Sequence, residues 1–518
     1  MTKTHRTLGL CTLLGSLAIF PMQGCTDLTE SPRSEIGPSN FYRNEAEVLA
    51  GLASVYAPLQ AGNFATLWSY YNLSEVTTDE IIVPTRGQDW YDAGLWLEMH
   101  RQTWSASSVA GLDFINGAWN SCFGGIARAN VLLDALTRLT IPNQAAVQAE
   151  LRAMRGFYYY LLMDMFGGVQ IVTDIEIKPR ARSTRAELFD FIEAELLAAR
   201  VDLPLTRPAT ENGRFTRGAA DAILASMYLN AQVFTGTVTA AGLQPGTARW
   251  QDAVNFSDSI LNSGVYSLAA NFGDNFTATN DNSPENIFVA KHHNSAGLGL
   301  NFVQRALHYN QFNPSPWNGF ATLAETYNAF DAADVRRQIF LIGPQVNLET
   351  GQPVTDRAGV PLVFTDTIGD ANSARENEGP RILKYPPDPN HVGENNGNDY
   401  VHFRLGEIYL IKAEAQFELG NAAGALLLLN QLRARVFEPD QPLATVDRDV
   451  ILRERLFELT GEAKRRQDLI RHGRFLNQWS TTMLNGKVDK NGEPYRILMP
   501  IPQPQLDANP LLVQNAGY

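Results

Sequence analysis

The feature that most constrains the fold is residues 150–166, ELRAMRGFYYYLLMDMF. Apolar residues recur there at intervals of three and four, which places them on one face of a helix. These residues are Leu151, Met154, Tyr158, Leu161, Leu162 and Met165, with Arg152 and Arg155 off that face. Gly167 and Gly168 follow directly and end the pattern. The segment predicts an amphipathic helix packed against other helices.

Further helical patterns follow along the chain. Residues 185–200, 217–234 and 250–262 each have one apolar face, and loops rich in Pro, Thr, Asn and Gly separate them. Later, residues 402–419 and 422–436 predict two helices joined by Gly420-Asn421, with Asn421 as the N-cap of the second. The second helix would turn Ala425, Leu428, Leu429 and Leu432 inward. Such a pair resembles a tetratricopeptide unit.

One long segment lacks helical periodicity. Residues 343–399 are rich in Gly, Pro, Asn and Asp, with a short strand-like patch at 361–365. A segment of this length inside a helical protein is usually a functional excursion. The fold class predicted is mainly α, with degenerate tetratricopeptide-like helix pairs, long irregular loops and a few short strands.

The N-terminus has the pattern of an export signal. Lys3 and Arg6 precede the apolar run 8–20, which is too short to cross a bilayer as a helix. A small residue, Gly24, then precedes Cys25, as in a lipobox. This predicts a signal peptide at 1–24, lipidation of Cys25 and a tether to residue 40. The alternative is an ordinary secretory signal with an incidental cysteine.

Cysteine content and charge limit the other options. If the signal is removed and Cys25 carries lipid, Cys122 is left alone and no intrachain disulfide forms. The net charge of −13 repels phosphate backbones, and no run of Lys or Arg offsets it. We therefore expect no nucleic-acid partner.

Several ordered blocks resemble one known family. The segment 150–173, ELRAMRGFYYYLLMDMFGGVQIVT, is similar to the hallmark helix of SusD/RagB proteins. The blocks at 182–204 and 214–229 resemble the next two of that family. Residues 399–436 match its R-x-x-E-x-x-L-x-x-AEA pattern at Arg404, Glu407, Leu410 and 413–415. The blocks at 451–473 and 499–518 resemble its closing segments.

The resemblance implies a fold and a role. It implies one helical domain over 41–518, with an N-terminal part at about 41–235 and a C-terminal part at about 236–518. It also implies a lipoprotein anchored in the outer membrane, facing the exterior, that binds a nutrient oligosaccharide or polysaccharide. The partner would be a SusC-like TonB-dependent transporter that receives the glycan. Neither catalysis nor a cofactor is implied.

A search for catalytic and metal-binding motifs found little. The chain has no H-E-x-x-H and no G-x-S-x-G, and the adjacent pair His292-His293 cannot face one metal from a helix. Carboxylates in the 343–399 segment offer oxygen ligands for calcium, but their spacing fits no EF-hand, and turn formation explains them better. They are Asp366, Asp370, Asp388, Glu394 and Asp399. The Arg and Glu residues of 453–471 are interpreted as ion pairs between helices.

Two loops combine aromatic and polar residues as a glycan site requires, since a sugar presents flat C–H faces and a rim of hydroxyls. The first, residues 79–104, supplies the candidates Arg86, Asp89, Trp90, Tyr91 and Trp96. The second, residues 301–320, supplies the candidates Tyr309, Trp317 and Asn318, with Gln304 and Asn310 nearby. For Trp119, in a helix-like segment, core packing is the better interpretation.

Three functions from different classes remain. The first is glycan capture for a transporter, and the second is a lipid-anchored glycoside hydrolase, which needs a carboxylate pair whose spacing only a structure gives. The third is a tetratricopeptide scaffold that binds only protein. Within the first class, a peptide or another non-sugar nutrient is the alternative ligand. The ordered family blocks favour glycan capture.

Overall fold

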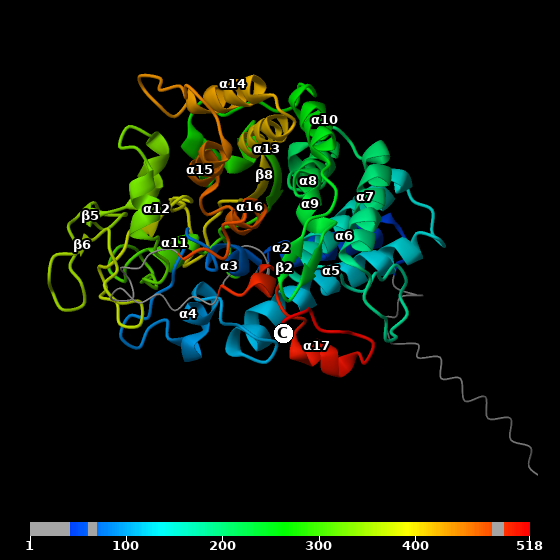
Figure 1. Cartoon of the computed structure of the whole chain (residues 1–518), viewed down its shortest axis with the longest axis horizontal. Coiled ribbons are helices and arrows are strands. Elements are labelled where there is room, and N and C mark those ends of the chain that lie inside the picture. The colour runs from blue at the N-terminus through cyan, green and yellow to red at the C-terminus, as the bar shows by residue number, and fades with distance from the viewer. Residues whose placement is uncertain (1–41, 61–69, 479–491) are drawn as a thin grey trace, which may run out of the picture. The chain divides into compact units, whose positions relative to one another are not determined.

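The helix at the hallmark segment is the centre of the N-terminal half of the computed structural model, which describes residues 42–60, 70–478 and 492–518. This helix, α6 (Gln144–Phe166), packs against α5 (Asn116–Ala135) on one side and α7 (Arg185–Asp202) on the other (Figure 1). It ends at Gly167, whose φ of 73° lies in the left-handed region that glycine adopts freely. The signal peptide, Cys25 and the tether lie outside the described residues.

One expectation about α6 is wrong. The apolar residues predicted to be inward are all buried, but so is nearly every residue from Glu150 onward. Arg155, expected off the buried face, is itself buried, and its Nη2 lies 2.6 Å from Oε2 of Glu195 on α7. Because a paired guanidinium can be buried, the hydrophobic pattern underestimated how completely neighbouring helices cover α6.

The next helices follow the predicted order. Thr184 caps α7 by a capping box with Glu187. The helix expected over 217–234 divides into α8 (Arg217–Leu229) and α9 (Ala231–Phe234). The break falls at Asn230, whose side chain donates to the carbonyl of Ser226 at 2.9 Å and ends α8. α10 (Trp250–Leu261) packs on both α8 and the later α13.

The C-terminal half contains a second correction. Residues 400–404, expected to lie in or next to a helix that starts at 402, form strand β8 (Tyr400–Arg404) instead. β8 pairs antiparallel with β3 (Asn286–Ala290), more than a hundred residues earlier, so that Val289 faces Val401. The helix α13 (Leu405–Glu418) begins only after this strand. A long-range partner therefore outweighed the local helical pattern.

The predicted helix pair is present. α13 packs on α14 (Ala422–Arg433), and Asn421 accepts a hydrogen bond from the main-chain N–H of Gly424 at 3.0 Å, as an N-cap does. The four residues predicted to point inward from α14 are all buried. α15 (Arg448–Leu459) and α16 (Arg465–Arg471) follow and complete the C-terminal helical layer.

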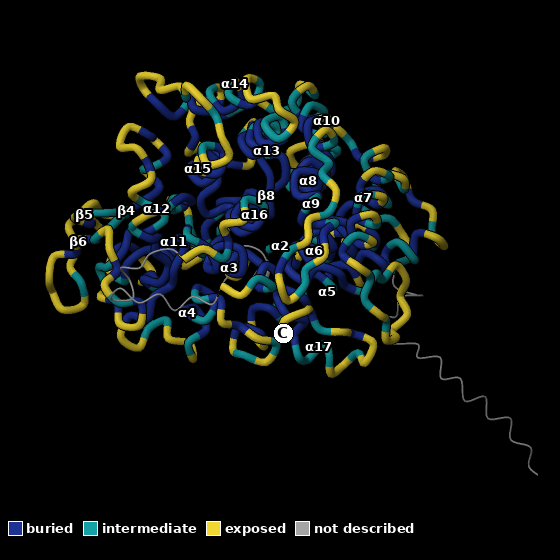
Figure 2. Tube along the Cα trace, viewed as in Figure 1, coloured by how far each residue is buried: buried dark blue, intermediate teal, exposed yellow. Residues whose placement is uncertain are grey.

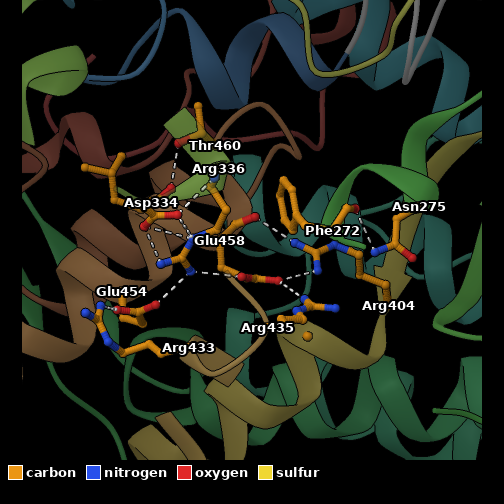
Figure 3. Close-up of polar contacts among 12 residues, drawn as sticks. Phe272, Asn275, Asp334, Arg336, Arg404, Arg433, Arg435, Glu454, Glu458 and Thr460 are labelled. Atoms are coloured by element: carbon orange, nitrogen blue, oxygen red, sulfur yellow. Dashed lines mark hydrogen bonds and ion pairs between the residues drawn. The ribbon is translucent and has the colours of Figure 1, made fainter. Parts of the chain in front are cut away.

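Buried ion pairs tie this layer together, as predicted for 453–471 (Figure 3). Glu458 on α15 receives Arg336 at 3.0 Å and Arg404 of β8 at 2.6 Å, and it also pairs with Arg435. Arg455 lies 2.8 Å from Asp468 on α16. Nearly all these groups are buried, so each charge depends on its partners.

The segment 343–399 consists mostly of loops. Its strand-like patch forms β6 (Val363–Phe364), which pairs with β5 (Gly343–Pro344) in a long hairpin. The hairpin lies at the left of Figure 1, on the side of α4 (Leu95–His100), α11 (Phe302–Ala306) and α12 (Ala324–Ala329), and its tip is mostly exposed (Figure 2). The remaining elements are α2 (Glu45–Gln60), α3 (Tyr70–Glu75), α17 (Gln503–Ala508), β1 (Thr237–Thr239), β2 (Gly242–Gln244), β4 (Phe340–Leu341) and β7 (Arg381–Ile382).

The fold class is mainly α with short two-stranded sheets, as predicted. Trp119 is buried on α5, in agreement with its interpretation as a core residue. Within the described ranges, no helix is both long enough and apolar enough to span a bilayer.

Candidate functional site

The two loops singled out from the sequence lie against each other. The indole Nε1 of Trp90 donates to the carbonyl of Trp317 at 2.6 Å, and the Tyr309 hydroxyl donates to Oδ2 of Asp89 at 2.6 Å. Residues more than 200 positions apart in the sequence therefore form one surface. We call the surface formed by Asp89, Trp90, Tyr91, Tyr309 and Trp317 the tryptophan site.

Trp90 is held in place from several sides. It is half-buried, with edge-on contacts to Trp96 at 5.3 Å and Phe320 at 5.8 Å between ring centroids. Its ring also covers Gly319, where an added Cβ would lie 2.3 Å from Cε2 of the indole. Glycine at 319 is therefore required for this close approach, and the indole has little freedom to rotate.

Other groups of the site are more accessible. Tyr91 is 60% exposed, and Trp317 is half-buried like Trp90 but has no aromatic ring of a described residue against it. The Asp89 side chain is 40% exposed and keeps acceptor capacity beyond its bond from Tyr309. The site thus offers aromatic faces and hydrogen-bonding groups side by side.

Backbone strain marks the same loops. Trp90, Asp92 and Ala93 have φ values of 62°, 38° and 55°, and Asn318, next to Trp317, has a φ of 52°. Non-glycine residues rarely occupy this region, and such outliers gather at ligand sites because the surrounding fold must hold them there. No sequence pattern predicts this strain.

Three predicted contact residues are buried and inaccessible to a ligand, contrary to expectation. Trp96 is 1% exposed and donates its Nε1–H to Asp92 at 2.7 Å, because it lies on α4 with its ring in the core. The Arg86 guanidinium donates to the carbonyls of Arg375 and Glu378. Asn318 donates to the carbonyl of Glu376 at 3.0 Å. All three support the loops from beneath.

The two other polar residues of the second loop differ in burial. Gln304 is fully buried, and its main-chain carbonyl accepts from the N–H of Trp317 at 2.7 Å. Asn310 is exposed, and its side chain donates to the carbonyl of Thr355 at 2.7 Å. Asn310 therefore connects the second loop to the β5–β6 hairpin.

The hairpin and the loop that follows it add two charged residues, Arg357 and Glu376, that sequence reasoning missed. The Arg357 guanidinium lies 4.1 Å from the Tyr309 ring centroid and 3.1 Å from Oδ2 of Asp89, and it also pairs with Glu376. Glu376 in turn lies 3.0 Å from Nε2 of His308. The sequence predicts a functional role for the irregular segment 343–399, but nothing in it indicates which residue reaches the site.

These contacts set the charge states. Burial raises the pKa of Glu376, but the hydrogen bonds from Arg357 and His308 outweigh burial and keep that pKa below its usual range. Burial lowers the pKa of His308 by more than Glu376 raises it, so the imidazole is neutral at pH 7. Burial, followed by the bond to Asp89, raises the pKa of Tyr309, which stays a hydroxyl donor.

Three of the five carboxylates considered for calcium have structural partners. Asp399 pairs with Lys291 and accepts from the N–H of His292 at 2.9 Å, while Asp388 accepts from the N–H of Asn390 at 2.8 Å. Asp370 accepts from the N–H of Asn372 at 2.8 Å, which is a turn. Over the described ranges, no three His, Cys, Asp or Glu side chains gather as a metal site requires.

The larger cavities lie away from the tryptophan site. One of about 370 Å³ is lined by Leu49, Tyr56 and Gly213 among others, and one of about 510 Å³ by His293, Pro387 and Asn390 among others. Neither has a tryptophan. Neither cavity therefore belongs to the tryptophan site.

Comparison with known proteins gives the family. Residues 266–518 match the family model described as the SusD family, and residues 29–229 match one described as starch-binding associating with outer membrane. The chain belongs to the SusD family. The boundary between the two matches falls near the division expected at about residue 235, which stays a prediction.

Relatives extend over most of the chain. The SusD-like protein P25 of Formosa agariphila is 24% identical, covering 96% of this chain and 98% of its own. The starch-binding protein SusD of Bacteroides thetaiotaomicron is 25% identical, covering 76% of each. A laminarin-binding SusD-like protein of known structure superposes with a TM-score of 0.71 at 24% identity, covering 92% of this chain and all of its own. Two of these relatives are named for binding, one of starch and the other of laminarin.

Proposed function

We propose that this SusD-family chain is a cell-surface lipoprotein of the outer membrane that binds a nutrient oligosaccharide or polysaccharide at the tryptophan site. It would then deliver the glycan to a SusC-like TonB-dependent transporter. The observation that carries the proposal is the meeting of Trp90 and Trp317 from two distant loops, with Asp89 and Tyr309 beside them.

The chemistry of the site suits a sugar. A half-exposed indole and an exposed phenol provide apolar area for the C–H face of a pyranose ring. Asp89 accepts hydrogen bonds, and Arg357 donates them, so vicinal hydroxyls find both kinds of partner. Rigid loops reduce the entropy lost on binding, and the contacts of Trp90 supply that rigidity.

The relatives support the choice of ligand class. One is named for starch binding and another for laminarin binding, and the N-terminal family model is described as starch-binding with outer-membrane association. Delivery to a transporter rests on the family resemblance, and anchoring rests on the Gly24-Cys25 lipobox.

Glu376, a carboxylate of the proposed site, is unsuited to act as the proton donor of a glycoside hydrolase. Glycoside hydrolysis needs one carboxylic acid with a raised pKa beside the scissile bond. Glu376, one of the two carboxylates joined by Arg357, has a lowered pKa and is therefore ionised. A peptide ligand would use the same aromatic faces and is an outcome of the test.

Binding should be measured by calorimetry against soluble starch, laminarin, other oligosaccharides and a mixed peptide library, with new reducing ends assayed in parallel. We expect saturable binding to a glycan and no new reducing ends above a control protein. Binding of peptides alone would mean that the nutrient is a peptide and not a sugar. Release of reducing ends would establish the hydrolase.

A further inference from the structure

The β5–β6 hairpin presents one arginine to the tryptophan site through a defined turn. Asp356 accepts from the main-chain N–H groups of Ala358 and Val360, both at 2.9 Å, and Gly359 takes a φ of 81°. This turn fixes the backbone on both sides of Arg357. The Arg357 main-chain N–H also donates to Oε2 of Glu376 at 3.1 Å. The hairpin is therefore bound to the site at this residue.

The Arg357 side chain is already engaged by the protein. Its guanidinium lies on the Tyr309 ring, 3.1 Å from Asp89, and is paired with Glu376, while 51% of the side chain stays exposed. Two carboxylates thus share one guanidinium, and the connected group carries one net negative charge. The exposed guanidinium can still donate to a ligand, but its charge is more than compensated.

Neighbouring basic groups do not reverse this balance. Arg86 and Arg381 are buried beneath the site, where their guanidinium groups donate to main-chain carbonyls of residues 375–379, and both keep their positive charge. Two further carboxylates offset these charges, since Glu378 acts electrostatically on Arg86 and Asp356 lies in the turn beside Arg357. His308 is fully buried and neutral. Arg375 is exposed on the same loop, but its guanidinium has no contact with Arg357, Asp89 or Glu376 among the described residues. The exposed guanidinium that contacts the tryptophan site, that of Arg357, is therefore already engaged by two carboxylates.

We propose that the tryptophan site selects uncharged glycans and rejects polyanionic ones, with Arg357, Asp89 and Glu376 as the group that makes the selection. A neutral sugar keeps the ion pairs intact and bonds its hydroxyls to the exposed edges of Arg357 and Asp89. A sulfated or uronic-acid chain gains from Arg357 only by competing with two resident carboxylates, and it meets their net charge. This inference rests on the proposed function and names the ligand class of its site.

The test compares each neutral glycan that binds with its own sulfated derivative, for example laminarin with laminarin sulfate and starch with starch sulfate. Alginate serves as a uronic-acid polymer. We expect the sulfated form to bind at least about fivefold more weakly than its parent, the factor that one unit charge at about 4 Å contributes in water. The difference should shrink as salt is raised, because the repulsion is screened.

Isosteric variants assign the effect to residues. Asp89→Asn and Glu376→Gln each remove one negative charge and should bring the affinities of parent and sulfated glycan closer together. Arg357→Gln should move the two affinities further apart and weaken binding of the parent glycan, since a hydrogen-bond donor is lost. Arg375→Gln removes an equal charge from the same loop and should leave the ratio unchanged. A purely structural role would alter melting temperature without altering this ratio.

The contrary results are distinct. If wild-type protein binds the sulfated glycan or alginate as tightly as any neutral glycan, or more tightly, the selection is overturned while glycan binding stands. A change of the ratio in Arg375→Gln with none in Arg357→Gln would also overturn it. If the protein binds neither neutral nor charged glycans, the proposed function is wrong, and this inference is wrong with it.

Discussion

At the scale of single residues, three tryptophans of one predicted site have three environments. Trp317 is half-exposed and is bonded through its main chain, Trp90 is wedged between Trp96 and Phe320, and Trp96 itself lies in the core. A loop that bends sharply, as residues 90–94 do, alternates between surface and interior within a few residues. The sequence singled out two loops that the structure brings together, because aromatic and polar residues mixed with Gly and Pro are typical of a site, but it did not indicate which aromatic residue is exposed.

Trp317→Ala should weaken glycan binding by about 1 to 3 kcal/mol, which is roughly tenfold to a hundredfold in affinity. Little change in melting temperature is expected, because no described ring packs on Trp317. Calorimetry and thermal melts on the same samples check this, with Trp250→Ala, a half-buried tryptophan on α10, as the matched control. A lowered melt with unchanged affinity would show that Trp317 is a structural residue.

A buried carboxylate pair makes stability depend on pH. Glu75 and Glu80 are fully buried and accept from the main-chain N–H groups of Ala463 at 2.5 Å and Gly461 at 2.9 Å. Burial raises the pKa of Glu80 to about 7, although Arg465 opposes it, and burial and then Glu80 raise the pKa of Glu75. The folded state therefore holds protons that the unfolded chain releases near pH 4.5.

We predict that Glu80 by itself makes the free energy of unfolding fall as pH rises from about 4.5 to 7, because its carboxyl holds a proton there in the folded protein and not in the unfolded chain. The buried histidines His292, His308 and His402, whose pKa values burial lowers, act in the opposite direction, so the effect of Glu80 is read from the difference between wild type and variant. The loss attributable to Glu80 is up to about 3 kcal/mol and is complete above its folded pKa. Glu80→Gln should remove this contribution, so that the stability of the wild type relative to the variant falls as pH rises when urea denaturation is followed at several pH values. An identical slope in the variant would show that Glu80 is ionised in the folded protein.

At the scale of elements, charged residues hold the C-terminal half together where hydrophobic patterns would not suggest contact. Glu458 on α15 joins Arg404 of β8, Arg336 and Arg435, so one carboxylate links three separate parts of the chain (Figure 3). The arginines hold the pKa of Glu458 well below its usual range against the opposing effect of burial. β8 itself forms because β3 lies beside it, and no window of local sequence contains both strands.

Glu458→Ala should lower the free energy of unfolding by about 3 to 5 kcal/mol, since three buried or nearly buried guanidinium groups lose a partner. Asp449→Ala, also on α15, removes the exposed ion pair with Arg474 and should cost about 1 kcal/mol or less. Chemical denaturation of both variants gives the comparison. Equal costs would mean that the buried network contributes no more than a surface pair.

At the scale of the whole molecule, the proposed role needs the described domain to stay attached to the membrane. The lipobox predicts attachment at Cys25, and no helix among the described residues could replace it as a membrane span. Attachment through this single lipid-bearing residue would tether the folded domain that carries the tryptophan site.

Cys25→Ser should abolish acylation and leave a soluble protein, because the thiol is the acceptor of the diacylglycerol. Membrane fractionation and intact-mass measurement check the result, with Cys122→Ala as a control that keeps the lipid. Wild-type-like partition of the Cys25→Ser protein into membranes would contradict the prediction.

The sequence by itself determined the family, the mainly α fold and most helix positions, and it singled out two loops that lie together in the structure, because helical periodicity, caps, family blocks and residue composition are local properties. Its errors have one physical cause. Arg155 lies inside because Glu195 of another helix pairs with it, β8 is a strand because β3 binds its edge, and Arg357 enters the site because a hairpin folds back onto Tyr309. Each of these depends on a partner distant in the sequence, and only the tertiary structure brings such partners together.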